Sequence, residues 1–127
     1  MRILYICTGN SFRSPVAEAL TRRYRPNLEV ESAGISPARD VAENAKSLLE
    51  DKDALRYVKP GPDSVTQRAI DEADLVVVME EDHKNYLLEN FDVEDNRIEC
   101  WCIDDPINPT VSPEVSFKEI EEKVKDL

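Results

Sequence analysis

Short apolar runs alternate with helix-length amphipathic segments along this chain, and this alternation restricts its possible folds more than any other feature. The strand-like runs are residues 2–6 (RILYI), 28–32 (LEVES), 74–79 (DLVVVM) and 97–103 (RIECWCI). The segments with apolar residues at helical spacing are 15–25, 41–55, 64–73, 81–90 and 113–127. Strands that alternate with helices predict an α/β fold with a parallel sheet and right-handed crossovers.

A chain of 127 residues, 41% of them hydrophobic, is long enough for one packed domain and too short for two. The run DLVVVM is apolar on both faces, as expected at the centre of a sheet that helices cover. We therefore expect a single domain over residues 1–127, with a four-stranded parallel sheet and helices on both faces. Such sheets bind ligands beyond the carboxyl ends of their strands, where residues 7–13 would lie.

Capping residues predict where two of the helices begin. Ser14 offers an N-cap side chain with Pro15 at the first helical position, and Pro26 ends that helix. Ser64, with Gln67 three residues later, is typical of a capping box. Residues 7–13 would then form a tight loop between a strand and a helix.

The net charge of −11 argues against a broad nucleic-acid-binding surface, because most of the protein would repel a phosphate backbone. The longest apolar run, residues 75–79, is far shorter than the roughly 20 residues of a membrane span, and no apolar leader opens the sequence. The three cysteines are an odd number without metal-ligand spacing, which indicates reduced thiols and no metal. We expect a soluble, cytoplasmic protein without nucleic-acid or membrane partners.

The segment CTGNSFRSP, residues 7–15, places a cysteine, a glycine and an arginine just before a predicted helix. A helix N-terminus carries unpaired amides and a partial positive charge, so a loop that leads into one can hold an anion. Gly9 permits the turn, Arg13 can clamp one tetrahedral oxyanion, and this positive environment stabilises a thiolate on Cys7. No lysine of a Walker motif is present, so the loop indicates a nucleophile that faces a monophosphate.

The same segment resembles the signature of the low-molecular-weight protein tyrosine phosphatases. The resemblance extends to residues 31–34 (ESAG), to Thr66 with residues 73–79, and to the pair Asp105-Pro106, so it covers roughly the whole chain. It implies strand order 2-1-3-4 and a cysteine-dependent phosphomonoesterase. The preferred interpretation is a protein tyrosine phosphatase. Phosphorylated proteins or small aryl phosphates would be its substrates and inorganic phosphate its product, with no cofactor and as a monomer.

The resemblance also implies roles for individual residues. Cys7 resembles the nucleophile that becomes a cysteinyl phosphate, and Arg13 resembles the residue that binds phosphate and stabilises the transition state. Asp105 resembles the general acid and base, because the family's acid directly precedes a proline, which Asp104 does not. Ser14 is also expected to be a hydrogen-bond partner of the thiolate, and Ser32 to support the loop. The residues expected to bind the substrate phosphate are Thr8, Gly9, Asn10, Ser11, Phe12 and Ser14.

Three residue types outside this pattern are expected to be structural. His83, the only histidine, is assigned a satisfied structural role, and Trp101 a place in the core. Cys100 and Cys102 flank Trp101 and should point together to the opposite face of the strand, where packing is their expected role.

The sequence departs from the family in its expected pocket walls and leaves the substrate open. Phe12 occupies a position where the family often has a second cysteine, residues 35–40 (ISPARD) and 107–110 (INPT) contain no aromatic residue, and KPGPDS at 59–64 replaces a basic stretch. The small hydroxyl residue Ser11 is similar to the residue that protein arginine phosphatases use, so that activity is the alternative. An arsenate reductase of the same fold is a weaker alternative. A silent phosphate-binding module is disfavoured because nucleophile, arginine and acid are all present.

Overall fold

Four parallel strands form one sheet in the computed structural model, which describes all residues from 1 to 127. The strands are β1 (Arg2–Cys7), β2 (Glu29–Gly34), β3 (Leu75–Val78) and β4 (Ile98–Cys100). The helices are α1 (Arg13–Tyr24), α2 (Glu43–Asp51), α3 (Gln67–Glu72), α4 (Glu81–Asn90) and α5 (Pro113–Lys125), with 3-10 turns at Leu55–Tyr57 and Asp95–Arg97. The order in the sheet is β2-β1-β3-β4, which confirms the expected fold.

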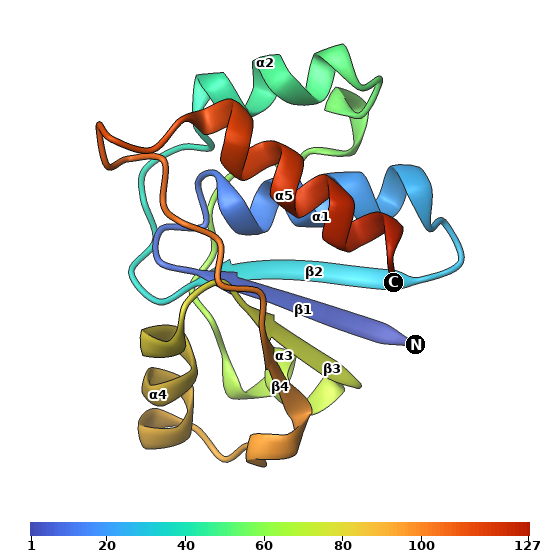
Figure 1. The fold of residues 1–127 in the computed structure, drawn as a ribbon. Helices are drawn as coiled ribbons and strands as arrows, with labels where there is room; N and C mark the ends of the chain where they lie inside the picture. The colour runs from blue at the N-terminus through green and yellow to red at the C-terminus, as the bar shows by residue number, and fades with distance from the viewer.

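Helices cover both faces of the sheet, with α1, α2 and α5 on one face and α3 and α4 on the other (Figure 1). Successive side chains of β1 point to opposite faces, so Ile3 and Tyr5 join the core under α1 while Leu4 and Ile6 join the core beside α3 and α4. The β3 residues Val76, Val77 and Val78 are fully buried, as predicted for an inner strand. Trp101 is buried against Tyr5, with ring centroids 5.3 Å apart, so its predicted core position is confirmed.

Both predicted helix caps are wrong, for local reasons. Helix α1 begins at Arg13 and not after Ser14, and its N-cap residue Phe12 makes no capping hydrogen bond. Ser14 therefore lies inside the first turn, where its hydroxyl is free to bond elsewhere. Helix α3 is capped by Thr66, whose Oγ1 accepts a hydrogen bond from the Ala69 N–H, so the cap lies two residues after Ser64.

Two predicted elements are shorter than expected. The second helix ends at Asp51, because residues 52–54 turn the chain and Asp53 has a positive φ of 55°. The last strand pairs with β3 only over Ile98–Cys100 and does not continue to Ile103. None of the helices is both long and apolar enough to cross a membrane.

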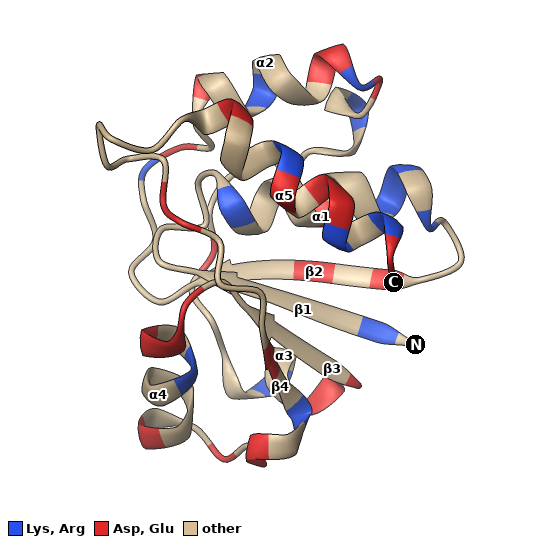
Figure 2. Cartoon of the chain, in the orientation of Figure 1, with Lys and Arg blue, Asp and Glu red and all other residues tan.

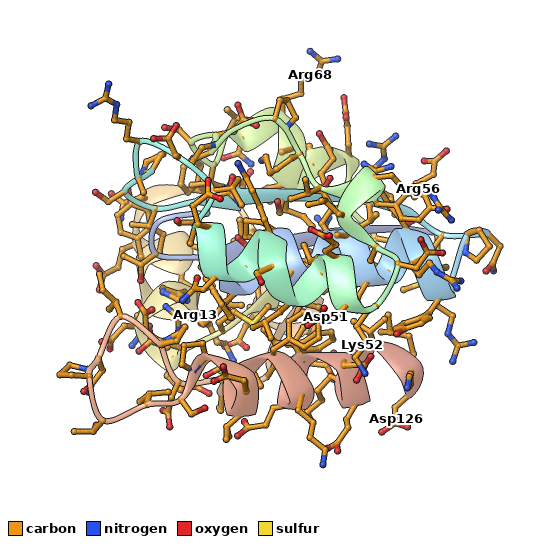
Figure 3. The ribbon with its side chains drawn as sticks, turned by 90° about the horizontal axis from the view of Figure 1, so that it is seen from above. Arg13, Asp51, Lys52, Arg56, Arg68 and Asp126 are labelled. Atoms are coloured by element: carbon orange, nitrogen blue, oxygen red, sulfur yellow. The ribbon has the colours of Figure 1, made fainter.

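Most charged side chains lie on the outside, and among the few that are buried Arg13 is the least exposed. Figure 2 shows acidic residues along the helices and at the start of α4, consistent with the net charge of −11. In Figure 3, Arg68 and Arg56 extend away from the ribbon, and the Arg68 side chain is 86% exposed. Arg13 differs because only 2% of its side chain is exposed, although it carries a full charge. A buried charge needs partners, and these lie at the carboxyl end of the sheet.

Candidate active site

The predicted phosphate loop lies where strand β1 ends and helix α1 begins. Cys7 is the last residue of β1, residues 8–12 form the loop, and Arg13 is the first residue of α1. Strand β1 is central, with β2 on one side and β3 on the other. The chain runs from β1 to β2 on one side and then crosses to β3 on the other side, so the strand order changes direction at β1. The loop thus lies beyond the carboxyl end of the sheet, at the switch in strand order where ligands of such folds bind.

Backbone hydrogen bonds from the segment after β2 hold the loop open. The N–H groups of Ile35, Ser36, Ala38 and Ala42 donate to the carbonyl oxygens of Cys7, Thr8, Gly9 and Ser11, at 2.9 to 3.1 Å. The carbonyls of the loop are therefore turned away from its centre and satisfied. The N–H groups of Thr8, Gly9, Ser11 and Phe12 make no hydrogen bond within the protein and can receive an anion.

Asn10 fixes the shape of the loop from within. Its backbone has a φ of 51°, in the left-handed region that asparagine tolerates better than most residues. Its side chain is fully buried and donates to Ser14 Oγ at 2.7 Å and to Ser32 Oγ at 3.0 Å. Its Oδ1 accepts from Lys59 Nζ at 2.7 Å and from the Asp63 N–H at 2.9 Å. All four hydrogen-bonding positions of the amide are used.

This network ends at the sulfur of Cys7. Because Ser14 Oγ accepts from Asn10, its own hydrogen can be donated to Cys7 Sγ, 3.0 Å away. The Asn10 N–H also donates to Cys7 Sγ, at 3.2 Å. At the other end, Ser32 Oγ donates to the buried carboxylate of Glu18 at 2.6 Å. Two donors thus converge on one sulfur, which is the environment that stabilises a thiolate.

Gly34 lets β2 approach the loop closely. A Cβ at this position would lie 2.8 Å from the Thr8 carbonyl oxygen and 2.9 Å from the Asn10 nitrogen. Both are backbone atoms of the phosphate loop, so no flexible side chain could give way. The glycine of the ESAG segment is therefore needed for contact with the loop.

Arg13 is held over the loop by four partners. One guanidinium nitrogen donates to the Ile103 carbonyl at 2.8 Å and lies 3.1 Å from a Glu80 carboxylate oxygen. The other lies 3.3 Å from Asp105 Oδ2 and 3.4 Å from Thr8 Oγ1. This arrangement fixes a cation beside the free loop amides, ready to bind an oxyanion.

His83 contacts the loop, which the sequence did not predict. Its Nε2 lies 2.9 Å from Thr8 Oγ1 and 3.3 Å from Glu80, while its buried Nδ1 has no partner. Burial, followed by the nearby Arg13 charge, lowers the pKa of His83 below 6.5. A neutral imidazole beside Thr8 is therefore the expected state at neutral pH.

Asp105, and not Asp104, faces the loop. Asp105 reaches Arg13 and also accepts a hydrogen bond from the Ile107 N–H at 3.1 Å. Asp104 is exposed, and only its backbone carbonyl is used, as an acceptor from Ser116 Oγ. The two neighbours thus have different surroundings, and only Asp105 reaches Arg13.

The loop opens into a cleft of about 390 Å³. Small side chains, including Ser36, Ala38 and Ala42, form one wall, and Pro106 and Ile107 form the other. The one aromatic residue in the lining is Phe12, whose side chain is almost wholly buried. Ser11 also lines the cleft, and its hydroxyl donates to the Asp40 carbonyl at 2.8 Å. Because this hydroxyl already has a partner, Ser11 contributes to the cleft mainly through the small size of its side chain.

The structure brings the predicted site residues together at one place and adds others that sequence reasoning missed. Lys59 and Asp63 support Asn10, so the KPGPDS stretch, which replaces the basic stretch of the family, supports the loop. Glu18 anchors Ser32 from the middle of α1, and Glu80 holds Arg13. No sequence spacing connects these residues to the loop, although the position of Glu80 directly after an inner strand was an available signal.

Cys100 and Cys102 lie outside the cleft; their predicted packing role is confirmed for Cys100, which packs against the core beside α3 and α4, and is wrong for Cys102. Cys102 is exposed and Cys100 is half-buried, with Glu81 close to both. These three are the one group of His, Cys, Asp and Glu side chains close enough to share a metal ion.

The cleft itself combines a thiol, an anion cradle and a carboxyl group, which suits metal-independent transfer of a phosphoryl group.

A family model described as low molecular weight phosphotyrosine protein phosphatase matches residues 2–127. The protein-arginine-phosphatase of Bacillus subtilis (strain 168) is 37% identical over 98 residues, which cover 72% of this chain and 63% of that protein. The low molecular weight protein-tyrosine-phosphatase PtpB of Staphylococcus aureus is 29% identical over 98 residues, covering 76% of this chain and 68% of the relative. The matched region is thus less than two thirds of the arginine phosphatase.

Solved structures share the fold over almost the entire chain. The tyrosine phosphatase Wzb from Escherichia coli K30, in complex with sulphate, superposes with a TM-score of 0.84 and 27% sequence identity. The superposition covers 98% of this chain and 94% of that chain.

Proposed function

Because the chain belongs to the low molecular weight phosphotyrosine protein phosphatase family, we propose that it hydrolyses phosphate from phosphorylated proteins through a cysteinyl phosphate. The observation that carries this proposal is the convergence of Cys7, Arg13 and Asp105 on one cleft whose loop amides are free. Inorganic phosphate is the second product. The proposed reaction needs no metal or cofactor, and we place it in the cytoplasm with the protein as a monomer.

In the first step, the Cys7 thiolate attacks the phosphorus atom and the bond to the leaving group breaks. The loop amides and the Arg13 guanidinium stabilise charge on the three equatorial oxygens. Asp105 donates a proton to the leaving atom, which is the role of a general acid. Ser14 and the Asn10 N–H hold the sulfur in place before attack.

In the second step, water attacks the phosphorus of the phosphocysteine. Asp105, now a carboxylate, accepts a proton from that water, and the Cys7 thiolate leaves. Its hydrogen-bond donors, Ser14 and the Asn10 N–H, stabilise the departing sulfur. Phosphate is released and the starting state is restored.

The cleft favours phosphoarginine over phosphotyrosine as the substrate. A phenyl ring gains most of its contact energy from stacking against aromatic or branched walls; Ser36, Ala38 and Ala42 offer neither, and Ile107 is the one branched apolar side chain opposite them. Ser11 leaves space beside the phosphate for a guanidinium group. The net charge of −11 also favours a basic substrate segment. The relative with 37% identity is a protein-arginine-phosphatase, which supports this choice.

The nucleophile is tested by trapping the intermediate. Rapid quenching during turnover should capture phosphate on Cys7, and Cys7→Ser should retain phosphate binding while losing turnover. The exposed Cys102 lies outside the cleft, so Cys102→Ser is the matched control and should retain turnover. Phosphate on any other residue, or an active Cys7→Ser variant, would contradict the mechanism.

The substrate is tested by comparing phosphoarginine and phosphotyrosine peptides of the same sequence. Ser11→Ile should lower phosphoarginine turnover at least about tenfold, around 1.4 kcal/mol, because the branched side chain fills the space, while aryl phosphate turnover stays within a few fold. Ser11→Ala keeps the space and should retain phosphoarginine turnover. Preference of the wild type for phosphotyrosine would reject the arginine assignment and leave a tyrosine phosphatase.

A further inference from the structure

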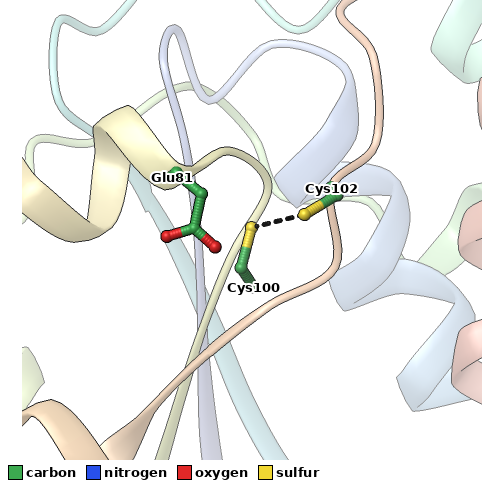
Figure 4. A group of neighbouring side chains, drawn as sticks. All are labelled: Glu81, Cys100 and Cys102. Carbon is green, nitrogen blue, oxygen red and sulfur yellow. Dashed lines mark hydrogen bonds between the residues drawn. The ribbon is translucent and has the colours of Figure 1, made fainter.

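Two thiols lie in contact at the end of β4, away from the phosphate cleft. The sulfur atoms of Cys100 and Cys102 are 3.1 Å apart and share a hydrogen bond, as Figure 4 shows. A disulfide bond is about 2.05 Å long, so roughly 1 Å separates this pair from a covalent bond. Trp101, between them in sequence, points into the core.

An irregular backbone brings the two sulfurs together. In a regular strand, residues two apart are about 6.6 Å apart, whereas the Cβ atoms of a disulfide are about 3.5–4.5 Å apart. Cys102 has a φ of 55°, in the left-handed region, which is unfavourable for a residue with a Cβ. The Trp101 N–H donates to the Val78 carbonyl and the Ile103 N–H to the Met79 carbonyl, at 2.9 and 3.0 Å. Cys102 is therefore an extra residue just after β4, between two hydrogen bonds to the consecutive residues Val78, the last of β3, and Met79, as in a β-bulge.

The two thiols differ in exposure and in proton affinity. Burial, together with the hydrogen bond to Cys102, raises the pKa of Cys100 to about 12. Cys100 therefore keeps its hydrogen and can donate it to the sulfur of Cys102. Cys102 is exposed, so it is the sulfur that a dissolved oxidant meets first. Glu81 lies with a carboxylate oxygen within 4.8 Å of both sulfurs.

We propose that Cys100 and Cys102 form a redox-active dithiol, separate from the phosphate site, that a hydroperoxide converts to a disulfide. The Cys102 thiolate attacks the hydroperoxide, the O–O bond breaks, and a sulfenic acid and an alcohol form, or water when the oxidant is hydrogen peroxide. The Cys100 sulfur then displaces the hydroxyl of Cys102, and its proton leaves with that hydroxyl as water. The hydroperoxide gains two electrons and the dithiol loses two.

The short separation favours a disulfide over a shared metal ion at these side chains. Two thiolates on one tetrahedral zinc ion, with Zn–S bonds of about 2.3 Å, would be about 3.8 Å apart. The third ligand would be Glu81, which is exposed. A disulfide requires only that the two sulfurs move closer from 3.1 Å.

The pair is also distant from Cys7. Strands β1 and β4 are separated by β3, and neighbouring strands are about 4.8 Å apart, so Cys7 and Cys100 belong to strands about 10 Å apart. A direct bond between them would require the sheet to open. The dithiol is therefore expected to oxidise within itself.

The test uses the reduced wild-type chain and the Cys7→Ser variant, each treated with one equivalent of hydrogen peroxide. Free thiols are then alkylated and the peptides weighed by mass spectrometry. In both proteins, the peptide with Cys100 and Cys102 should be two hydrogens lighter and unalkylated, and dithiothreitol should restore both thiols. This result does not depend on phosphatase activity, so it stays informative even if the proposed function fails.

Single-thiol variants test the order of the steps. Cys100→Ser should stop at the sulfenic acid of Cys102, which dimedone traps, whereas the wild type should give at least about tenfold less adduct because Cys100 resolves it. Overoxidised cysteines without an internal disulfide, equal dimedone adducts in wild type and Cys100→Ser, or a disulfide from Cys7 to either cysteine would overturn the proposal.

Discussion

Replacing Asn10 with alanine tests whether the buried network holds the phosphate loop in shape. The change removes four hydrogen bonds of 2.7 to 3.0 Å, to Ser14, Ser32, Lys59 and the Asp63 N–H. A buried hydrogen bond contributes about 1 kcal/mol net, which gives about 4 kcal/mol for the set. Alanine at a φ of 51° adds about 1 kcal/mol.

The partners of Asn10 reduce part of this loss. Lys59 Nζ retains the Ser32 carbonyl and Asp63, and Ser32 Oγ retains Glu18. We therefore expect Asn10→Ala to lower the free energy of unfolding by about 3–5 kcal/mol, which lowers the melting temperature by about 10–20 °C. Turnover should fall at least about a hundredfold, because a misplaced loop no longer orients its amides.

Urea unfolding and steady-state turnover measure these two effects separately. The matched control is Asn85→Ala, since Asn85 is an exposed asparagine on α4 and alanine is favourable in a helix. A loss below about 1 kcal/mol for Asn10→Ala would refute the reasoning, because the loop would then be held by its backbone bonds alone.

Three further predictions follow from the geometry of the site. Asp105→Asn should slow turnover of substrates with poor leaving groups by roughly a hundredfold in kinetic assays, while Asp104→Asn changes little; equal losses would mean that Asp105 is structural. Gly34→Ala should lower both activity and melting temperature because its Cβ meets loop backbone at 2.8 Å, whereas Gly61→Ala has open space and should be neutral. Burial lowers the pKa of His83 below 6.5, so the stability that neutral His83 contributes is complete above pH 6.5 and is lost as the pH falls from 6.5 towards the folded-state pKa. The stability of His83→Gln, measured by denaturation at several pH values, should therefore depend less on pH over that window.

Sequence patterns were sufficient where a single segment determines the outcome. The apolar run of β3 marks an inner strand because burial on both faces leaves no polar position in it. The segment from Cys7 to Arg13 marks an anion loop because the chemistry of nucleophile, turn and clamp is contained in seven consecutive residues. The choice of Asp105 over Asp104 depended only on the adjacent proline.

Predictions failed where a hydrogen bond formed in the folded protein overrides the local preference of a residue. Ser14 is a residue type that favours helix caps, but its hydroxyl is used by Asn10 and Cys7, and the helix starts two residues earlier than predicted. Cys102 belongs to a strand-like run, but the hydrogen bonds of its two neighbours to β3 push it into a bulge. Local preference is worth about 1 kcal/mol or less per residue, which one tertiary hydrogen bond can outweigh.

The sequence by itself determined the α/β class, the place of the phosphate loop and the three residues proposed to carry the chemistry, because each depends on spacing along the chain. Only the tertiary structure decided what supports them: Lys59 beneath Asn10, Glu80 against Arg13, and the contact between Cys100 and Cys102. The first two contacts join residues 49 and 67 positions apart, and the third requires an unusual backbone angle. The contacts of Lys59 and Glu80 form only when crossovers bring distant segments together at the strand ends, so spacing along the chain does not specify these partners.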